Sequence, residues 1–153
     1  MRVVLQNVLS SSVSIDGKIV SSINKGFLLL VGFTHTDNEL IVDKMVNKIV
    51  GLRVFMDEFG KTNLSLKDVG GEILSVSQFT LYGNVKEGKR PSFVNAMRPE
   101  NATKLYDYFN LKLKETGLNI QTGIFGADMK VNLINDGPFT LIIDSRELWD
   151  LWK

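Results

Sequence analysis

The run Gly26-Phe27-Leu28-Leu29-Leu30-Val31-Gly32-Phe33 is almost continuously apolar and has the length of a β-strand. A strand covered on only one face alternates apolar and polar residues, so this run predicts a central strand buried on both faces. Before it, the turn Asp16-Gly17 joins the β-rich runs 12–15 and 18–23 and predicts a hairpin, because Asp-Gly adopts the positive dihedral angles of a tight turn. Residues 2–9 predict a first strand.

Two amphipathic helices are predicted further along the chain. Thr36-Asp37-Asn38-Glu39 is a capping box, which places Thr36 at the start of the first helix. The apolar face of this helix consists of Ile41, Val42, Met45, Val46, Ile49 and Val50. Pro99 suits the first turn of the second helix, and Gly117 suits its C-terminal cap. The apolar stripe of that helix consists of Ala102, Leu105, Tyr106, Phe109 and Leu113.

The remaining β-rich segments are short and cover residues 53–56, 63–66, 72–76, 128–133 and 139–143. Because single helices separate the strand runs without regular βαβ alternation, we predict an α+β fold with a β-barrel-like sheet and two main helices. It forms one domain over residues 1–153, with a core of about residues 1–144. The tail 145–153 carries Trp149 and Trp152, which we expect to pack on the core or at a subunit interface.

The composition excludes several classes of protein. A chain of 153 residues with 44% hydrophobic content is large enough for one proper core. The net charge of +1 indicates neither disorder nor a strongly basic surface for nucleic acid. No apolar run is long enough to cross a membrane, and the N-terminus is typical of a strand rather than a signal peptide. The lack of cysteine excludes disulfides and thiolate chemistry and suits the cytoplasm, where we expect the protein.

The polar loop at residues 83–92 is the candidate contact for RNA. It carries Lys86, Lys89 and Arg90 against one acidic residue, Glu87. Such a loop is often simply solvated, but its cations can also contact phosphates. Because the whole chain is nearly neutral, any contact with RNA must come from a local patch.

The titratable residues leave few catalytic options. The single histidine, His35, lies just before the first predicted helix, where we expect a role in the loop or cap rather than in catalysis. With one histidine and no cysteine, a zinc site would need mainly carboxylates. The chain also lacks a P-loop motif and a strand-linked GxGxxG motif. We therefore expect no metal and no cofactor, and redox, kinase and metallohydrolase activities are disfavoured.

Two stretches present groups that suit an active site. Ser77-Gln78-Phe79-Thr80-Leu81 closes a strand with two hydroxyl groups, an amide and an aromatic ring, although the same residues occur in ordinary edge strands. Asn135-Asp136-Gly137-Pro138-Phe139-Thr140 contains a Gly-Pro pair, which forms either a simple turn or a cis peptide bond. In the second case the bare glycine backbone can approach a ligand and offer carbonyl oxygen atoms to a substrate amine.

Together these two stretches resemble the signature motifs of the D-aminoacyl-tRNA deacylase family. The resemblance runs in order from residue 1 to about residue 144. The other segments that resemble the family are Val3-Val4-Leu5-Gln6, Arg90-Pro91-Ser92-Phe93, Leu105-Tyr106-Asp107-Tyr108-Phe109 and Gly123-Ile124-Phe125-Gly126-Ala127-Asp128-Met129. One position departs from the family: Asn7 stands where an arginine usually follows the glutamine of the first strand. If that arginine braces the pocket or the Gly-Pro loop, this chain must brace it differently.

The resemblance implies a homodimeric enzyme that hydrolyses the ester bond of D-aminoacyl-tRNA, and of glycyl-tRNA mischarged on non-cognate tRNA. It also implies that Gly137 and Pro138 form a cis Gly-Pro motif that enters the active site of the partner subunit. The residues that would line the catalytic pocket around the ester are Ser77, Gln78, Phe79 and Thr80. Those that would hold the terminal adenosine are Phe125 and Met129. The partners would be aminoacyl-tRNA and a second copy of the chain, with neither DNA nor a membrane.

Selection and hydrolysis follow as expectations. A backbone wall of Gly137 and Pro138 would reject an L side chain by collision, whereas a D side chain would point to solvent and glycine would pass. Thr80 is either the nucleophile or part of the pocket lining, and we favour the lining because the sequence shows no base to activate it. Two other functions remain open: a non-catalytic module that binds tRNA ends, and a dimeric interaction protein whose motifs are structural.

Overall fold

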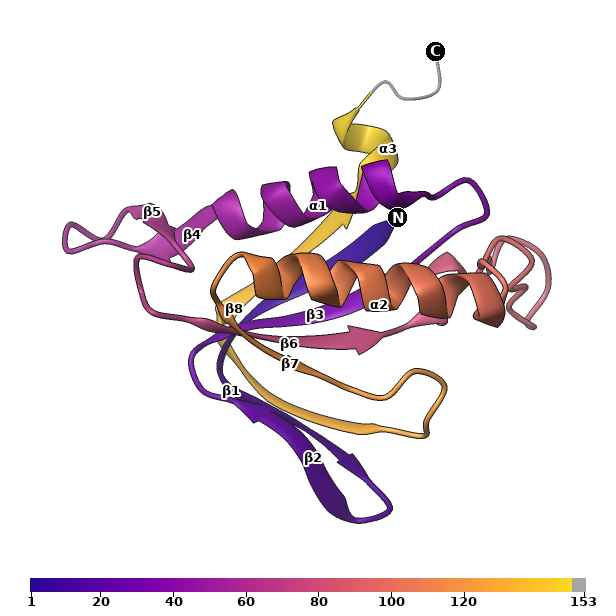
Figure 1. The fold of residues 1–153 in the computed structure, drawn as a ribbon, viewed down its shortest axis with the longest axis horizontal. Helices are drawn as coiled ribbons and strands as arrows, with labels where there is room; N and C mark the ends of the chain where they lie inside the picture. Colours follow the sequence, from indigo (N-terminus) through magenta and orange to yellow (C-terminus); the bar gives the residue numbers. More distant parts are fainter. Residues whose placement is uncertain (150–153) are drawn as a thin grey trace.

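The computed structural model describes residues 1–149, and its sheet curls beneath two helices that lie side by side on one face (Figure 1). In chain order the elements are β1 (Arg2–Ile15), β2 (Lys18–Ile23), β3 (Gly26–Gly32), α1 (Glu39–Gly51), β4 (Arg53–Met56), β5 (Thr62–Ser65), β6 (Glu72–Ser77), η1 (Phe79–Tyr82), α2 (Pro99–Glu115), β7 (Asn119–Thr122), β8 (Lys130–Asp144) and α3 (Ser145–Leu148). The element η1 is a short 3₁₀-helix. Within residues 1–149, none of these helices combines the length and apolar character needed to span a bilayer.

The strand β3 is the central strand that the apolar run predicts. It pairs antiparallel with β1 on one side and parallel with β6 on the other. Phe27 and Leu29 pack in the core beneath the helices, whereas Leu28 packs in a second core inside the curled sheet. The prediction that both faces of this strand are buried is therefore confirmed.

The long strand β1 connects the two halves of the sheet. Its first half pairs with β3 and its second half with β2, while β8 pairs along the other edge of β1. The resulting order is β2-β1-β3-β6-β7, with β8 beside β1. β2 curls back toward β7, where the Ser21 hydroxyl donates a hydrogen bond of 2.5 Å to the Thr122 carbonyl. The sheet is therefore nearly closed, in agreement with the β-barrel-like prediction.

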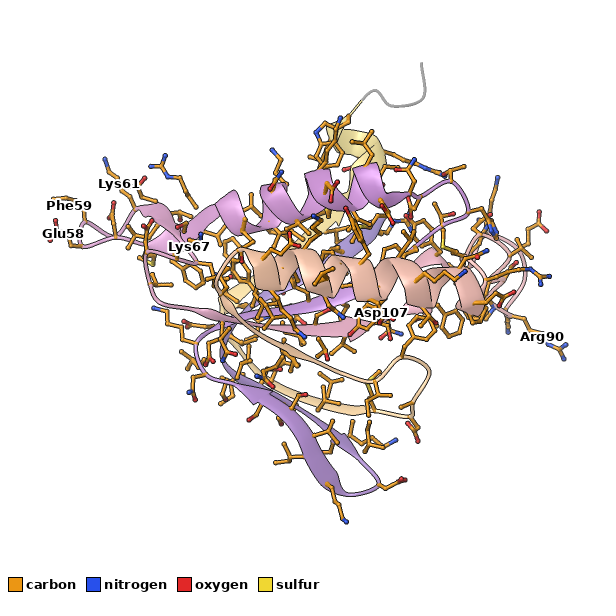
Figure 2. All side chains as sticks on the ribbon, in the orientation of Figure 1. Glu58, Phe59, Lys61, Lys67, Arg90 and Asp107 are labelled. Atoms are coloured by element: carbon orange, nitrogen blue, oxygen red, sulfur yellow. The ribbon has the colours of Figure 1, made fainter. Side chains whose placement is uncertain are left out.

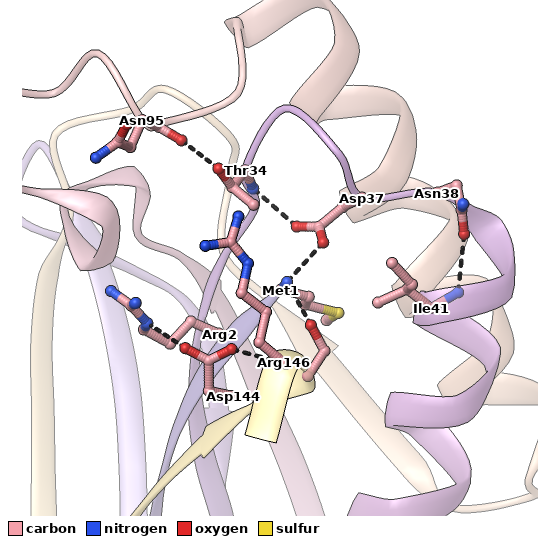
Figure 3. Close-up of polar contacts among 10 residues, drawn as sticks. Met1, Arg2, Thr34, Asp37, Asn38, Ile41, Asn95, Asp144 and Arg146 are labelled. Carbon is pink, nitrogen blue, oxygen red and sulfur yellow. Dashed lines mark hydrogen bonds and ion pairs between the residues drawn. The ribbon is translucent and has the colours of Figure 1, made fainter. Parts of the chain in front are cut away.

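The cap of α1 differs from the prediction. Its N-cap is Asn38, whose Oδ1 accepts a hydrogen bond of 3.0 Å from the Ile41 N–H, so Thr36 is not the cap. Asp37 fixes this choice because its carboxylate is held outside the helix, where it accepts a hydrogen bond of 2.6 Å from the Met1 ammonium (Figure 3). The start of α1 is thereby tied to the start of β1.

The other predicted elements are confirmed, but the strands are divided differently. The predicted strand 2–9 and the run 12–15 form one strand, β1. β4 and β5 pair with each other, and Pro99 is the first residue of α2. The segments predicted at 128–133 and 139–143 belong to one strand, β8, because the ladder to β1 continues past a bulge. The sequence did not predict β7 as a strand, yet its four residues pair parallel with β6.

The tail forms α3 and then packs against α1. Trp149 is half-buried, and the Lys44 Nζ lies 5.7 Å from the centroid of its ring. This part of the tail therefore contacts α1. Trp152 lies outside the described residues.

Candidate functional site

A pocket of about 300 Å³ opens where β6 ends. One wall is the segment that follows β6, and the other is the loop between β7 and β8. The lining residues are Val76, Ser77, Gln78, Phe79, Phe125, Gly126, Ala127, Asp128, Met129 and Val131. The structure therefore brings together five of the predicted site residues, which are Ser77, Gln78, Phe79, Phe125 and Met129.

The first wall forms because β6 stops pairing after Gln78. Ser77 is still in register with Val31 of β3, and Gln78 donates its N–H to the Val31 carbonyl at 2.7 Å. The chain then turns into η1 and presents the exposed ring of Phe79. The pairing of β6 with β7 ends at Ser75, so Ser77 and Gln78 pair on the β3 side alone before the chain leaves the sheet.

The start of η1 leaves two backbone donors beside the pocket. The N–H groups of Phe79 and Thr80 have no acceptor among residues 1–149, as is usual in the first turn of a helix. Thr80 is exposed and does not line the pocket, and its Oγ1 accepts a hydrogen bond from the Gln78 Nε2. Of the four predicted catalytic residues, Thr80 is thus the one whose side chain stands outside the cavity.

The second wall depends on two glycines. Gly126 has a φ of +79°, a left-handed conformation that strains any other residue. A Cβ atom on Gly123 would come within 2.6 Å of the Met129 Sδ, so glycine leaves room for that side chain to reach the pocket. On the same wall, the Phe125 ring lies 5.9 Å from the ring of Tyr106 on α2. The loop is therefore held against the helix layer.

The pocket carries little charge. Among residues 1–149, Asp128 is the only ionisable residue in the lining, and the Lys130 Nζ lies 3.0 Å from its carboxylate. His35 is exposed, and its Nε2 lies 2.6 Å from the Val94 carbonyl oxygen, outside the pocket lining. This position agrees with the predicted loop role of His35. Among residues 1–149, no three acidic or histidine side chains gather as metal ligands.

Gly137 and Pro138 stand outside the ladder between β1 and β8. Gln6 pairs with Thr140 and Val8 with Asn135, which leaves the intervening residues of β8 as a bulge. The Gly137–Pro138 peptide bond is cis, as the resemblance predicts, and both residues are exposed. Neither of them lines the pocket of its own chain.

The bulge is braced by Asn135 rather than by Asn7. The Asn135 Oδ1 accepts a hydrogen bond of 2.7 Å from the Phe139 N–H, and its Nδ2 donates one of 2.8 Å to the Thr140 Oγ1. Asn7 is buried, and its Nδ2 donates to the Val54 carbonyl at 3.3 Å. The side chain that replaces the usual arginine therefore turns toward β4.

The three cations of the 83–92 loop do not lie together in one pocket. Lys86 lines a second pocket, whereas Lys89 and Arg90 do not, and Arg90 extends from the end of the molecule (Figure 2). The other cations of this second pocket are Arg2 and Arg146, which no motif in the sequence singles out. In the first pocket, Gly126, Ala127 and Asp128 were missed as lining residues although they lie in a segment that resembles the family.

Known proteins resemble this chain along almost its whole length. The family model described as D-Tyr-tRNA(Tyr) deacylase matches residues 4–144. A D-aminoacyl-tRNA deacylase from Lactobacillus acidophilus is 58% identical over 144 residues, which cover 94% of this chain and 99% of that protein. A D-aminoacyl-tRNA deacylase from Brevibacillus brevis is 54% identical over 145 residues, which cover 95% of this chain and 100% of that protein.

Two solved structures share the fold. One, described as c-Myc DNA Unwinding Element Binding Protein, is 41% identical, has a TM-score of 0.88 and covers 94% of this chain and 98% of that chain. The other, described as a probable eukaryotic D-amino acid tRNA deacylase, is 18% identical, has a TM-score of 0.82 and covers 93% of this chain and 97% of that chain. At this low identity the second likeness supports the fold alone.

Proposed function

This chain belongs to the D-aminoacyl-tRNA deacylase family, and we propose that it hydrolyses the ester between a D-amino acid and the terminal ribose of tRNA. It is thus a hydrolase that proofreads charged tRNA, and we expect it to act in the cytoplasm. The proposal rests on the pocket that is lined by the segment after β6 and by the loop before β8. Release of free D-amino acid and intact tRNA by the purified protein tests it. Binding of tRNA without release of either enantiomer would instead favour a non-catalytic module that binds tRNA ends.

Within this pocket, the two walls would hold different parts of the substrate. The apolar side chains of Phe125 and Met129 suit the flat terminal adenine, because bases stack on aromatic and apolar groups. Ser77, Gln78 and Phe79 would then surround the ester. Thr80 is not part of the lining but directly follows Phe79, so its role would be limited to its backbone N–H at the edge of the pocket.

The active unit would be a homodimer in which each Gly-Pro bulge completes the pocket of the partner. Gly137 and Pro138 are exposed and do not line their own pocket, which supports a role in a second subunit. Within residues 1–149, no strand pairs with the second edge of β8. Exposed apolar side chains also lie along this strand pair, with Leu9 on β1 and Ile142 on β8, the latter 72% exposed. An unpaired apolar edge of this kind favours association with another chain.

Mixing two inactive variants tests this exchange. Gly137→Ala damages the bulge and Gln78→Ala damages the pocket. In a mixed dimer, one site would combine the intact pocket of one chain with the intact bulge of the other. Subunit mixing should therefore restore about a quarter of wild-type activity, because half of the dimers are mixed and each has one intact site. If the bulge served its own chain, no mixture would recover activity.

Chirality would be selected by collision. If the pocket fixes the ester carbonyl and the α-amino group, the hydrogen and the side chain exchange places between enantiomers. A wall formed by Gly137 and Pro138 would leave room only for hydrogen on one side, so an L side chain would clash. Glycine has no side chain on either side, and its ester on non-cognate tRNA would be hydrolysed too.

Hydrolysis would proceed by positioning and oxyanion stabilisation. Water attacks the ester carbonyl carbon and loses a proton, and the carbonyl oxygen takes up negative charge. The bond to the ribose oxygen then breaks as that oxygen takes up a proton, which gives a free amino acid and a ribose hydroxyl. The free N–H groups of Phe79 and Thr80 would stabilise that charge, whereas the Gln78 N–H is already bonded to Val31. The second hydroxyl of the ribose would help to activate the water, because the described part of the chain places no ionisable group other than Asp128 in the lining.

A further inference from the structure

A second pocket, of about 510 Å³, lies at the other end of η1, because Phe79 lines the first pocket and Tyr82 lines this one. Its lining includes Arg2, Thr34, Tyr82, Lys86 and Arg146. The three cations, Arg2, Lys86 and Arg146, come from β1, from the 83–92 loop and from α3. We call this cavity the cationic pocket.

Arg2 is held rigidly at the wall of the cationic pocket. Its Nε donates to the Asp144 Oδ2 at 2.9 Å, and its Nη1 donates to the Leu81 carbonyl at 2.7 Å. Its guanidinium carbon lies 4.5 Å from the centroid of the Tyr82 ring, a cation–π arrangement. Arginine carries five N–H donors, so this fixed group keeps donors that no residue of 1–149 uses.

Arg146 faces the same pocket from α3. Its backbone N–H donates to the Asp144 Oδ1 at 3.0 Å, so one carboxylate holds the side chain of Arg2 and the main chain of Arg146. Figure 3 shows its guanidinium extending from α3 toward the segment that carries Thr34. Among residues 1–149 this guanidinium has no hydrogen-bond or ion-pair partner.

The charges of the cationic pocket do not cancel. Asp144 is the carboxylate bonded to Arg2, and the nearby Asp37 is paired with the Met1 ammonium at 2.6 Å. Arg146 and Lys86 are therefore left in excess. The paired N–H donors of a guanidinium group match the oxygen atoms of a phosphate. Of the anions that this cavity could bind, a phosphate therefore suits it better than the carboxylate of a bulky apolar ligand.

We propose that the cationic pocket binds a backbone phosphate of the substrate tRNA, upstream of the terminal adenosine. The element η1 separates the two pockets, and its four residues span about 8 Å at the rise of a 3₁₀-helix. A stacked strand advances about 3.4 Å per nucleotide, so the phosphate lies about two nucleotides away. This inference rests on the proposed function, because it takes the phosphate from the same tRNA.

Arg146→Gln and Lys86→Gln test the proposal without touching the bonds that hold Arg2. Lys67→Gln is the matched control, since Lys67 is exposed at the other end of the molecule from Arg90 (Figure 2). The probe is a deacylated acceptor-stem minihelix, and its dissociation constant is measured over a range of salt concentrations. Each pocket variant should weaken binding about fivefold and flatten the slope of log K against log salt by about 0.7, whereas the control should bind as wild type does. Unchanged affinity and slope in both pocket variants would overturn the proposal.

A second measurement separates this inference from the proposed function. A D-aminoacyl adenosine lacks upstream phosphates, so wild type and Arg146→Gln should hydrolyse it equally. If wild type hydrolyses neither substrate but still binds the minihelix through Arg146 and Lys86, the phosphate site stands and the deacylase proposal fails. The pocket could instead bind free phosphate, and a titration with inorganic phosphate, monitored by NMR, tests this alternative. Phosphate binding that needs Arg146, together with minihelix binding that does not, would overturn the tRNA assignment.

Discussion

The Tyr106 hydroxyl donates a hydrogen bond of 2.8 Å to the backbone carbonyl of Ser75. Tyr106 lies on α2, and Ser75 lies on β6 two residues before Ser77 of the pocket lining. The same carbonyl accepts the Gly123 N–H at 2.9 Å, where the second wall of the pocket starts. A single carbonyl oxygen therefore joins the helix layer to both walls of the candidate active site.

Tyr106→Phe should lower the free energy of unfolding by about 1 kcal/mol, the usual net value of a buried hydrogen bond. Burial raises the pKa of Tyr106, so the hydroxyl stays neutral and remains a donor. The control is Tyr108→Phe, which removes a hydroxyl bonded to Asp43 at a less buried place on the same helix. Urea unfolding of wild type, Tyr106→Phe and Tyr108→Phe measures the three free energies of unfolding. Equal stability of Tyr106→Phe and wild type would show that this bond does not support the pocket.

Asn135→Ala should slow deacylation of D-aminoacyl-tRNA by about 10²-fold, because a displaced positioning group typically costs that much. The side chain accepts from the Phe139 N–H and donates to the Thr140 Oγ1, so its loss frees the Gly-Pro bulge. Asn135→Asp keeps the acceptor and loses the donor, so its rate should fall between those of wild type and Asn135→Ala. The measurement is kcat/KM of the folded variants. A wild-type kcat/KM for Asn135→Ala would contradict the bracing role of this side chain.

Thr80→Ala should retain deacylation within about tenfold of wild type, because only its backbone N–H is assigned to the oxyanion. Its hydroxyl lies outside the pocket lining and accepts a hydrogen bond from Gln78. Single-turnover kinetics with bound D-aminoacyl-tRNA isolate the chemical step. A loss of several orders of magnitude with normal tRNA binding would identify Thr80 as the nucleophile.

The stability difference between wild type and Asp144→Asn should disappear in acid. Burial opposes ionisation of Asp144, but hydrogen bonds from the Arg146 N–H and the Arg2 guanidinium hold its pKa below the usual 3.8. The unfolded chain therefore takes up a proton first, and the stability contributed by Asp144 is present above pH 3.8 and is lost as the pH falls through the folded pKa. At pH 7 the variant should lose about 2 kcal/mol, since the bonds are to a charged group.

Urea unfolding between pH 7 and pH 2.5 measures this difference. Asp107→Asn, at an exposed carboxylate of α2 (Figure 2), is the control and should match wild type throughout. A gap between wild type and Asp144→Asn that stays constant into acid would show that the Asp144 charge does not stabilise the fold.

The fold was predictable where a local pattern matched one element. The apolar run at residues 26–33 and the Asp16-Gly17 turn are of this kind. The continuity of β8 was not predictable, because the bulge around Gly137 and Pro138 interrupts the alternation that marks a strand. The cap of α1 was ambiguous because neighbouring residues can each cap a helix, and the bond from Asp37 to Met1 decides between them.

The candidate site was predictable in part. Ser77, Gln78 and Phe79 follow one another at the end of an apolar strand, so their polar and aromatic groups alone indicate the rim of a pocket. Long-range pairing accounts for what was missed. Arg2 and Arg146 stand at opposite ends of the sequence and meet only because Arg2 pairs with Asp144 across the ladder between β1 and β8. No local pattern marks such a pair.

Deacylation of matched D- and L-aminoacyl-tRNA, with a chelator present and with Gly137→Ala alongside, tests the central claim most directly. Gly137 has a φ of +139°, and an added Cβ would come 2.9 Å from the Phe139 nitrogen, so alanine must distort the bulge. The account predicts fast release of the D-amino acid, slow release of the L-amino acid, no effect of the chelator, and loss of selective release in the variant. Equal release of both enantiomers by the wild-type protein would contradict it.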